Sequence, residues 1–479
     1  MQANPDIPLD SPSKEQKRAL DEVLEDAIGS FGRYQLLILT LVFAPILCVA
    51  MQVMNWTFVA SDQIYTGNFS IFEQWQIEPE NRSQVKATVQ SFYFTGQVVG
   101  SYVTGIMGDS HGRKWTMYVT LFIQSTCGLL LAVAPNWWSF SLLKFGTGFA
   151  QPGLYGIPVL YGLEILGKPH RRLCAIALNV FYASGMLLIP LAAWLIRDQR
   201  IFHAALSIPT FIFMLYWAIP ESPIWLVAKG RLDEAERVVK MAAKMNGRPI
   251  PENWLSSWNN EDDIEETKST FSFLALFRTP EMRKRILAST VIWPTISMLY
   301  FGLTMKSDLN GGSLYVSFIL SCLMEIPGVA LTYLLINAIG RRLLISVSFF
   351  VCGVFLLLNW VLFSVAPTFL LLLLLLVCKI GATCVDDASY THLPEMMPTL
   401  LRTTALGYCG SMSRIGAIFA SYIAYWLVDS YGIGVLILPF SLFSFASAAL
   451  TQFCLPETHG KTMPETIEDV EKTRSESQK

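Results

Sequence analysis

Apolar residues are gathered in long runs, and polar stretches separate these runs from one another. Most runs have about 20 residues or more, the length that an α-helix needs to cross a bilayer. Because lipid offers the backbone no hydrogen-bond partner, such runs are expected to be helices. They cover residues 34–60, 88–107, 115–134, 138–162, 173–195, 201–219, 286–305, 313–338, 343–364, 366–390, 402–428 and 432–455. The pattern predicts an all-α integral membrane protein with twelve transmembrane helices.

The composition agrees with a membrane location. Hydrophobic residues make up 53% of the 479 residues and charged residues only 15%, whereas about a quarter of the residues are charged in soluble domains. A soluble multidomain enzyme is therefore excluded. The formal net charge of -2 also argues against a nucleic-acid-binding protein, because such proteins carry a large and clustered positive charge.

Lysine and arginine residues indicate the orientation of the chain. Most of the 35 such residues fall in the two tails and in alternate loops, on one side of the predicted bilayer. The loops on the other side hold only Arg82, Lys86, Arg197, Arg200 and Lys306. Since basic loops stay in the cytoplasm, both termini are expected to be cytoplasmic.

The first outer loop carries two sequons for N-glycosylation, at Asn68 and Asn81. Both lie on the side of the membrane where this modification takes place, so both asparagines are candidate glycosylation sites. The nine cysteines lie in or at the edges of the predicted helices, and no disulfide framework is expected.

A long polar stretch divides the chain into two halves with six apolar runs each. Ahead of the first run, residues 20–28 have apolar positions at helical spacing, which predicts a short amphipathic helix lying along the membrane. The expected domains are a cytoplasmic N-terminal segment (1–33), a six-helix bundle (34–219), a cytoplasmic linker with short helices (220–285), a second six-helix bundle (286–455) and a cytoplasmic tail (456–479).

Matching motifs recur at corresponding places in the two halves. The pairs are Gly108–Lys114 with Gly340–Arg342, Glu164 and Arg171 with Glu395 and Arg402, and Pro220–Pro223 with Pro456–Thr458. Ordered repeats of this kind indicate duplicated bundles that face each other across a substrate site near the bilayer midplane.

Together with several longer strings, these motifs resemble one known family. The inner-loop string Gly108–Lys114 is typical of the major facilitator superfamily, and narrower matches are Gly29–Gln35, Pro220–Leu226, Pro398–Arg402 and Leu455–Lys461. The whole set resembles the organic cation/anion/carnitine transporter family. The chain departs from the family in its short first outer loop, which lacks cysteine, and in Ile224, where the family usually has an arginine.

The resemblance implies the major facilitator fold, with two pseudo-symmetric six-helix bundles, and a secondary transporter of small organic ions that works by alternating access. It implies the plasma membrane as location, and no catalytic residue, cofactor or metal. The expected partners are a small organic ion and the lipid bilayer, without nucleic acid, and the oligomeric state stays open. Organic cations or carnitine-like zwitterions are favoured, and the alternatives are an organic anion exchanger and a non-transporting membrane sensor or binding protein.

Charges at the inner ends of the helices are candidate gating residues. They are Asp109, Arg113, Glu164, Arg171, Glu395 and Arg402. The resemblance implies that Asp109 with Arg402, and Glu164 with Arg171, belong to an ion-pair set that breaks when the halves separate. For Arg113 the alternative is simple anchoring on the cytoplasmic side of the membrane.

Three charged residues fall near the middle of predicted helices. Glu325, Lys379 and Arg414 each lie about 18 Å along the axis from a helix end, in a hydrocarbon core of about 30 Å. A charge at this depth is costly unless it is paired or hydrated, so all three are candidate substrate ligands. Glu325 and Arg414 could instead pair structurally with each other, and Lys379 could be a structural or gate residue. Lys144 lies near the end of its helix and is expected to extend to the membrane surface.

The strings around these charges resemble the family most closely in a way that favours a substrate carrying both a positive and a negative charge. The string at Glu325 is similar to the cation and carnitine branches, and the string at Arg414 to the anion and carnitine branches. Asp386 and Tyr390 share one helical face with Lys379. Aromatic and amide residues on the other cavity-lining helices of the family complete the candidate substrate site: Tyr155, Asn179, Tyr182, Tyr300 and Phe301.

Overall fold

The computed structural model describes residues 20–61, 64, 70–214, 219–249, 276–309, 311–398, 401–461, 463–464 and 466–471. All regular secondary structure within these ranges is helical. The predicted sequon at Asn68 and the central stretch 250–275 lie outside the described residues.

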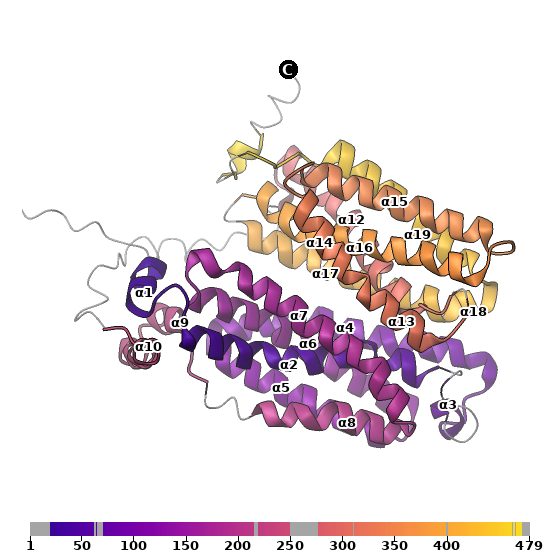
Figure 1. Ribbon diagram of the computed structural model, residues 1–479, viewed down its shortest axis with the longest axis horizontal. Helices are drawn as coiled ribbons and strands as arrows, with labels where there is room; N and C mark the ends of the chain where they lie inside the picture. The colour runs from indigo at the N-terminus through magenta and orange to yellow at the C-terminus, as the bar shows by residue number, and fades with distance from the viewer. Residues whose placement is uncertain are drawn as a thin grey trace, which may run out of the picture.

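Six long segments form the first half of the molecule, drawn in indigo to magenta in Figure 1. They are α2 (Arg33–Val59), α4 (Pro79–His111), α5 (Arg113–Leu130) with η2 (Leu131–Val133), α6 (Trp137–Ile165), α7 (Arg172–Leu195) and α8 (Gln199–Ile212). Shorter helices accompany them: α1 (Leu20–Ile28), α3 (Ile71–Gln74), η3 (Lys168–His170), α9 (Pro223–Ala228) and α10 (Leu232–Asn246). Each predicted apolar run of this half therefore has a helix.

The second half, drawn in orange to yellow, repeats the arrangement. Its segments are α12 (Pro280–Met305), α13 (Leu314–Leu323) with α14 (Glu325–Leu335), α15 (Arg341–Leu362), α16 (Thr368–Met396), α17 (Arg402–Ser421) with η7 (Tyr422–Leu427) and α18 (Val428–Tyr431), and α19 (Gly434–Cys454). The break between α13 and α14 precedes Pro327, which has no N–H to donate to the preceding turn. The break makes Glu325 the first residue of α14.

Within the described residues, eight helices are long and apolar enough to cross a membrane by length and composition alone. The other four segments of the two bundles are α4, α6, α8 and α17. The described part of α8 has 14 residues, and the other three carry buried polar side chains, including Gln97, Lys144 and Ser413. These side chains lower the mean hydropathy of helices that are nevertheless enclosed by the bundles.

Close helix contacts hold each half together. On α6, a Cβ atom added to Gly148 would lie 2.0 Å from the carbonyl oxygen of Tyr93 on α4. In the second half, a Cβ added to Gly416 on α17 would lie 2.2 Å from the carbonyl oxygen of Pro294 on α12. Small residues at such crossings let helix backbones approach closely, as is usual between membrane helices.

Two sequence-based expectations are wrong. Lys144 does not reach the membrane surface, because its side chain is fully buried and donates to the side chain of Asn55 and to the carbonyl oxygen of Gln52. These acceptors on α2 provide the Lys144 ammonium with hydrogen bonds, which lipid cannot provide. The apolar face of α1 does not lie on the membrane either, because Val23 and Ala27 are buried in a cluster that includes residues of α10.

Candidate functional site

A cavity of about 670 Å³ lies between the two halves. Helices α2, α4, α6 and α7 of the first half and α12, α14, α16 and α17 of the second half contribute its walls. Nine of the ten substrate residues predicted from the sequence line it: Tyr155, Asn179, Tyr182, Tyr300, Phe301, Glu325, Asp386, Tyr390 and Arg414. The tenth, Lys379, is buried behind this wall and contacts Glu325.

Glu325 and Lys379 form a buried ion pair. The Nζ atom of Lys379 lies 3.1 Å from Oε1 of Glu325, and the two side chains are 1% and 11% exposed. Tyr300 donates its hydroxyl to the same Glu325 oxygen at 2.7 Å, and Lys379 also donates to Oγ1 of Thr304 at 2.8 Å. The partner of Glu325 is thus Lys379, and the alternative pairing with Arg414 is wrong.

Three other charged residues of the cavity have no such partner. Arg414, Asp386 and Asp387 line the cavity, and their side chains make no ion pair or hydrogen bond with any described residue. Because Glu325 and Lys379 neutralise each other, one arginine and two aspartates determine the charge that a ligand meets. With these groups ionised, the cavity has an excess of one negative charge.

Aromatic rings surround these charges. Tyr155 and Tyr182 meet edge to face in the first half, with ring centroids 5.8 Å apart. Tyr300 and Phe301 meet in the same way in the second half, at 5.1 Å. Aromatic faces stabilise nearby cations, so the walls suit an organic cation as well as its apolar substituents.

Several lining residues are absent from the sequence-based set. Gln97 of α4, Gln151 of α6, Asp387 of α16 and Tyr333 of α14 also line the cavity. The two glutamines are 2% and 4% exposed. An uncharged amide deep within an apolar run is a signal that could have identified them, since polar groups inside a membrane need partners.

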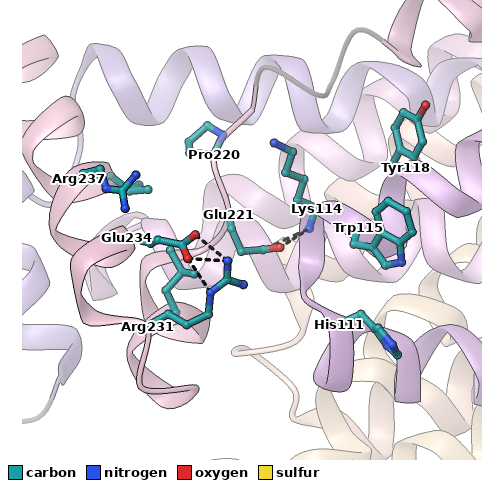
Figure 2. Close-up of a pocket in the computed structure, with 11 residues that line it drawn as sticks. His111, Lys114, Trp115, Tyr118, Pro220, Glu221, Arg231, Glu234 and Arg237 are labelled. Carbon is teal, nitrogen blue, oxygen red and sulfur yellow. Dashed lines mark hydrogen bonds and ion pairs between the residues drawn. The ribbon is translucent and has the colours of Figure 1, made fainter.

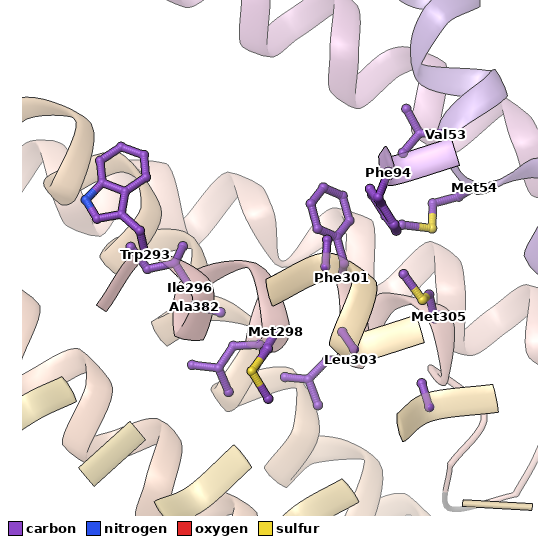
Figure 3. Close-up of a cluster of buried hydrophobic side chains, with 14 of the residues drawn as sticks. Val53, Met54, Phe94, Trp293, Ile296, Met298, Phe301, Leu303, Met305 and Ala382 are labelled. Atoms are coloured by element: carbon purple, nitrogen blue, oxygen red, sulfur yellow. The ribbon is translucent and has the colours of Figure 1, made fainter. Parts of the chain in front are cut away.

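The halves meet at the end of the molecule where α3 and α18 lie, here called the loop end (Figure 1). The Thr57 and Tyr425 hydroxyls are hydrogen-bonded across the halves at 2.8 Å, and Ser83 donates to Asp429 at 2.8 Å. Deeper in, Phe94 packs against Phe301, with ring centroids 5.0 Å apart. Figure 3 shows Met54 and Phe94 from the first half opposite Phe301 and Met305 from the second. This apolar contact separates the cavity from the loop end.

The opposite end, where α1, α9 and α10 lie, is here called the motif end. Cavity residues on this side are widely exposed, with Ile176 at 57% and Tyr333 at 71%. No ion pair joins the two halves at this end within the described residues. The cavity is therefore open toward the motif end.

In the first half, the motif-end charges pair with one another. Arg113 lies 2.8 Å from Oε1 of Glu164 and 3.0 Å from Oδ1 of Asp109. Glu221, from the Pro-Glu-Ser-Pro string, accepts the backbone N–H groups of Arg113 and Lys114 at 3.0 and 3.1 Å, as Figure 2 shows for Lys114. The carboxylate therefore caps the N-terminus of α5.

The second half repeats this construction. Arg341 lies 3.1 Å from Glu395, and Glu457 accepts the backbone N–H groups of Arg341 and Arg342 at 3.0 Å each. The Pro-Glu strings and the Gly-Arg turns thus recur because each acid caps the helix that follows the turn. Asp109 pairs with Arg113 and its side chain is 80% exposed. The implied pair of Asp109 with Arg402 is therefore not formed in this conformation.

Comparisons with known proteins agree with this geometry. The sequence model of the family described as "Sugar (and other) transporter" matches residues 41–469. Organic cation/carnitine transporter 2 of Homo sapiens is 32% identical over 420 residues, which are 87% of this chain and 73% of that protein. The chain belongs to the organic cation/anion/carnitine transporter family of the major facilitator superfamily.

Other members of the family are similarly related. An organic cation transporter protein of Drosophila melanogaster is 30% identical over 82% of this chain and 72% of its own length. Solute carrier family 22 member 2 of Mus musculus is 33% identical over 80% of this chain and 68% of its own length. The resemblance seen in the sequence motifs is therefore confirmed.

Solved structures show the same fold at low sequence identity. A partially occluded inward open form of the xylose transporter XylE from E. coli has a TM-score of 0.70 at 14% identity, covering 90% of this chain and 99% of that one. An inward open form of XylE gives a TM-score of 0.65 at 16% identity, covering 91% and 98% of the two chains. The predicted fold of twelve helices in two halves is confirmed.

Membership of the transporter family establishes the general activity. The protein is a multi-pass membrane transporter and not an enzyme. It moves small organic molecules by alternating access, in which the two halves expose a central site first to one side and then to the other. The cavity described above, closed at the loop end and open at the motif end, is one of the two states that this mechanism needs.

Proposed function

We propose that this family member carries small organic cations, or carnitine-like zwitterions with a cationic group, across the plasma membrane. The observation that carries the proposal is the charge of the cavity, where carboxylates outnumber cationic groups: neither Asp386 nor Asp387 forms an ion pair within the described residues, and Glu325 is paired with Lys379. Surplus carboxylates surrounded by low-dielectric protein attract a cation. The relatives, which are organic cation and carnitine transporters, support the same substrate class.

Each part of the substrate has a proposed partner. We assign the cationic group to Asp386 and Asp387, and the carboxylate of a zwitterion to Arg414, whose guanidinium can bind a carboxylate through two hydrogen bonds. Tyr155 and Tyr182 face the substrate from the first half through their ring faces. A substrate that touches both halves can hold them in one relative position, and its release allows them to move.

The Glu325–Lys379 pair has a supporting role in this proposal. It holds the Tyr300 hydroxyl at 2.7 Å from Glu325 and so orients a cavity-lining ring. Phe301, Tyr390 and Asn179 complete the contact surface.

We further propose that the motif end is the cytoplasmic end. The distribution of lysine and arginine supports this orientation, which leaves Asn81 outside the cell as a glycosylation site. The corresponding domains are the segment 1–33, the bundle 34–219, the linker 220–285, the bundle 286–455 and the tail 456–479, with both ends of the chain in the cytoplasm.

The motif-end charges form the cytoplasmic gate in this proposal. Its members are Asp109, Arg113, Glu164, Arg171, Glu395 and Arg402. Asp109 is exposed and the Nε atom of Arg402 has no hydrogen-bond partner among the described residues. A pair between these two side chains would join the halves when the motif end closes, and the present open form resembles the inward open XylE structures.

A second candidate is exchange of organic anions. Arg414 favours it, because its guanidinium has no acidic partner within the described part of the chain. The two nearby aspartates oppose it, since they repel an anion in the same cavity. A sensor that binds substrate without moving it is a third candidate, with the same ligands.

Uptake by proteoliposomes separates these candidates. Saturable uptake of labelled tetraethylammonium and carnitine is expected, without uptake of p-aminohippurate. Uptake of p-aminohippurate alone would indicate an anion exchanger, and saturable binding without uptake would indicate a sensor.

The variant Arg414→Ala tests the assigned role of the arginine. Charge-assisted hydrogen bonds are worth about 1.5–3 kcal/mol, so carnitine affinity should fall about 10- to 100-fold while tetraethylammonium affinity stays within about twofold. Competition against labelled substrate measures both affinities. Equal loss for the two substrates would show that Arg414 is structural.

A further inference from the structure

Two glutamines in the cavity wall have unused hydrogen-bond acceptors. Gln97 and Gln151 line the cavity, are 2% and 4% exposed, and their Oε1 atoms have no hydrogen-bond partner among the described residues. A buried acceptor without a donor destabilises the protein by about 1–3 kcal/mol. A wall with two such atoms therefore favours a ligand that brings hydrogen-bond donors.

The position of Gln151 relates it to the proposed cation subsite. Gln151 and Tyr155 are four residues apart on α6 and therefore share one helical face. Tyr155 lines the cavity from the first half, and Asp386 and Asp387 line it from the second half. The amide of Gln151 thus belongs to the part of the first half that faces the two aspartates.

The two walls of the cavity differ in chemical character. Every charged residue that lines it, namely Glu325, Asp386, Asp387 and Arg414, comes from the second half, within the described residues. The first half contributes neutral hydrogen-bonding groups, including Gln97, Gln151 and Asn179. A cation held by the aspartates is consequently faced on its other side by neutral amide groups, whose oxygens can accept hydrogen bonds.

We infer that the cavity selects ammonium substrates that carry at least one N–H group over quaternary ammonium substrates of the same size and charge. A protonated primary, secondary or tertiary amine can donate to a carboxylate of the second half or to an amide oxygen of the first half. A quaternary nitrogen is covered by carbon and leaves these acceptors unpaired, and such sites discriminate strongly against ligands without the donor. This inference rests on the proposed function and specifies its substrate class.

The aromatic walls do not produce the same preference. The Tyr300 ring already faces the Lys379 ammonium at 3.5 Å. The rings of Tyr155 and Tyr182 can stabilise a substrate cation through charge, and a methylated ammonium satisfies that interaction as well as a protonated amine. A preference for N–H substrates would therefore come from the amide oxygens and carboxylates. Loss of the amides should reduce the preference without abolishing cation binding.

Matched pairs of compounds provide the test. Carnitine is compared with norcarnitine, and choline with N,N-dimethylethanolamine, so that each pair differs only by replacement of an N-methyl group with N–H. Each compound competes with labelled tetraethylammonium for uptake by proteoliposomes at pH 7, where the tertiary amines are protonated. The N–H member should inhibit at a concentration at least about tenfold lower than its quaternary partner.

Variants of Gln97 and Gln151 test whether these two side chains produce the preference for N–H compounds. Gln151→Met and Gln97→Met keep the side-chain length and remove the acceptor, so each should weaken the N–H compounds and leave the quaternary compounds within about twofold. Gln124→Met is the matched control, because Gln124 is 1% exposed, has no hydrogen-bond partner for either amide atom among the described residues, and does not line the cavity. The control should preserve the full preference.

The outcomes are distinguishable from those that test the proposed function. Equal inhibition within both pairs, or tighter binding of the quaternary members, would overturn the inference while transport of organic cations stood. An undiminished preference in the double variant Gln97→Met/Gln151→Met would also overturn it. Inhibition by none of the four compounds would overturn both proposals. Retained inhibition by choline shows that a variant is folded.

Discussion

At the scale of single residues, the buried charges of this protein are held by partners on neighbouring helices. Lys379 on α16 pairs with Glu325 on α14 and bonds to Thr304 on α12. Lys144 on α6 uses the neutral oxygens of Asn55 and Gln52 on α2. A charge in the bilayer is expensive unless it is paired, so these contacts explain how such residues are tolerated inside the bundles.

The variant Glu325→Gln should destabilise the protein as well as reduce transport. It leaves the Lys379 ammonium buried without a counter-charge, and removing one partner of a buried pair costs about 3–5 kcal/mol. We expect a lower melting temperature, measured by fluorescence-detected size-exclusion chromatography after heating.

The double variant Glu325→Gln/Lys379→Met separates support from ligand binding. It removes both charges, so stability should return toward that of the natural protein. If substrate affinity returns as well, Glu325 acts through the pair. If affinity for ammonium compounds stays low in a stable protein, Glu325 is itself a substrate ligand.

At the scale of helices, two features determine how the elements join. Glycine allows backbones to touch at the α4–α6 and α12–α17 crossings, and a glutamate caps the N-terminus of both α5 and α15. For Glu457, burial raises the pKa, but four backbone N–H groups outweigh this effect and hold the pKa below its ordinary value. Its carboxylate therefore remains charged at neutral pH and favours the start of α15.

The variant Gly148→Ala should weaken the α4–α6 crossing. Its Cβ would lie 2.0 Å from a carbonyl oxygen of Tyr93, so the helices must separate, and overpacking of this kind typically costs about 1–3 kcal/mol or more. Gly156→Ala on the same helix is the matched control, because a Cβ there meets nothing within 4 Å. Thermal unfolding should show a lower midpoint for the first variant only; equal midpoints would mean that the crossing adapts.

At the scale of the whole molecule, the halves are joined along α4 and α17, where Ser411 donates to Tyr102 at 3.1 Å, and at the loop end. Hydrogen bonds join Thr57 to Tyr425 and Ser83 to Asp429 there, and Phe94 packs on Phe301. At the motif end the charged motifs pair within each half. Transport by alternating access requires the loop-end contacts to break, so they should control the rate of the cycle.

Cross-linking the loop end should stop transport. In the variant Ser83→Cys/Asp429→Cys the two sulfurs replace side chains whose oxygens are 2.8 Å apart, and a thiol-specific cross-linker would hold the halves together. We expect uptake to fall to background and to return when a cleavable linker is reduced. The single variants treated in the same way should retain uptake. Full uptake in the cross-linked protein would show that this end does not open.

The sequence by itself determined the elements and much of the site. Long apolar runs must be helices in lipid, and repeated motifs indicate two related bundles, so the fold followed from local pattern and chemistry. Charged residues within these runs could also be identified as site candidates from the sequence, because a charge at that depth is costly unless it is paired or hydrated. Nine of the ten proposed ligands accordingly line the cavity.

Only the tertiary structure decided which of these residues are partners. The position of a residue along its helix gives the depth of its side chain in the membrane. It does not give the rotation of the helix or the residues that the side chain contacts, since these come from segments distant in the chain. For this reason Glu325 pairs with Lys379 rather than Arg414, Lys144 is enclosed rather than exposed, and Asp109 bonds within its own half. The same packing leaves Gln97 and Gln151 in the cavity wall with unpaired oxygens, a property that arises from contacts and is therefore absent from any single stretch of sequence.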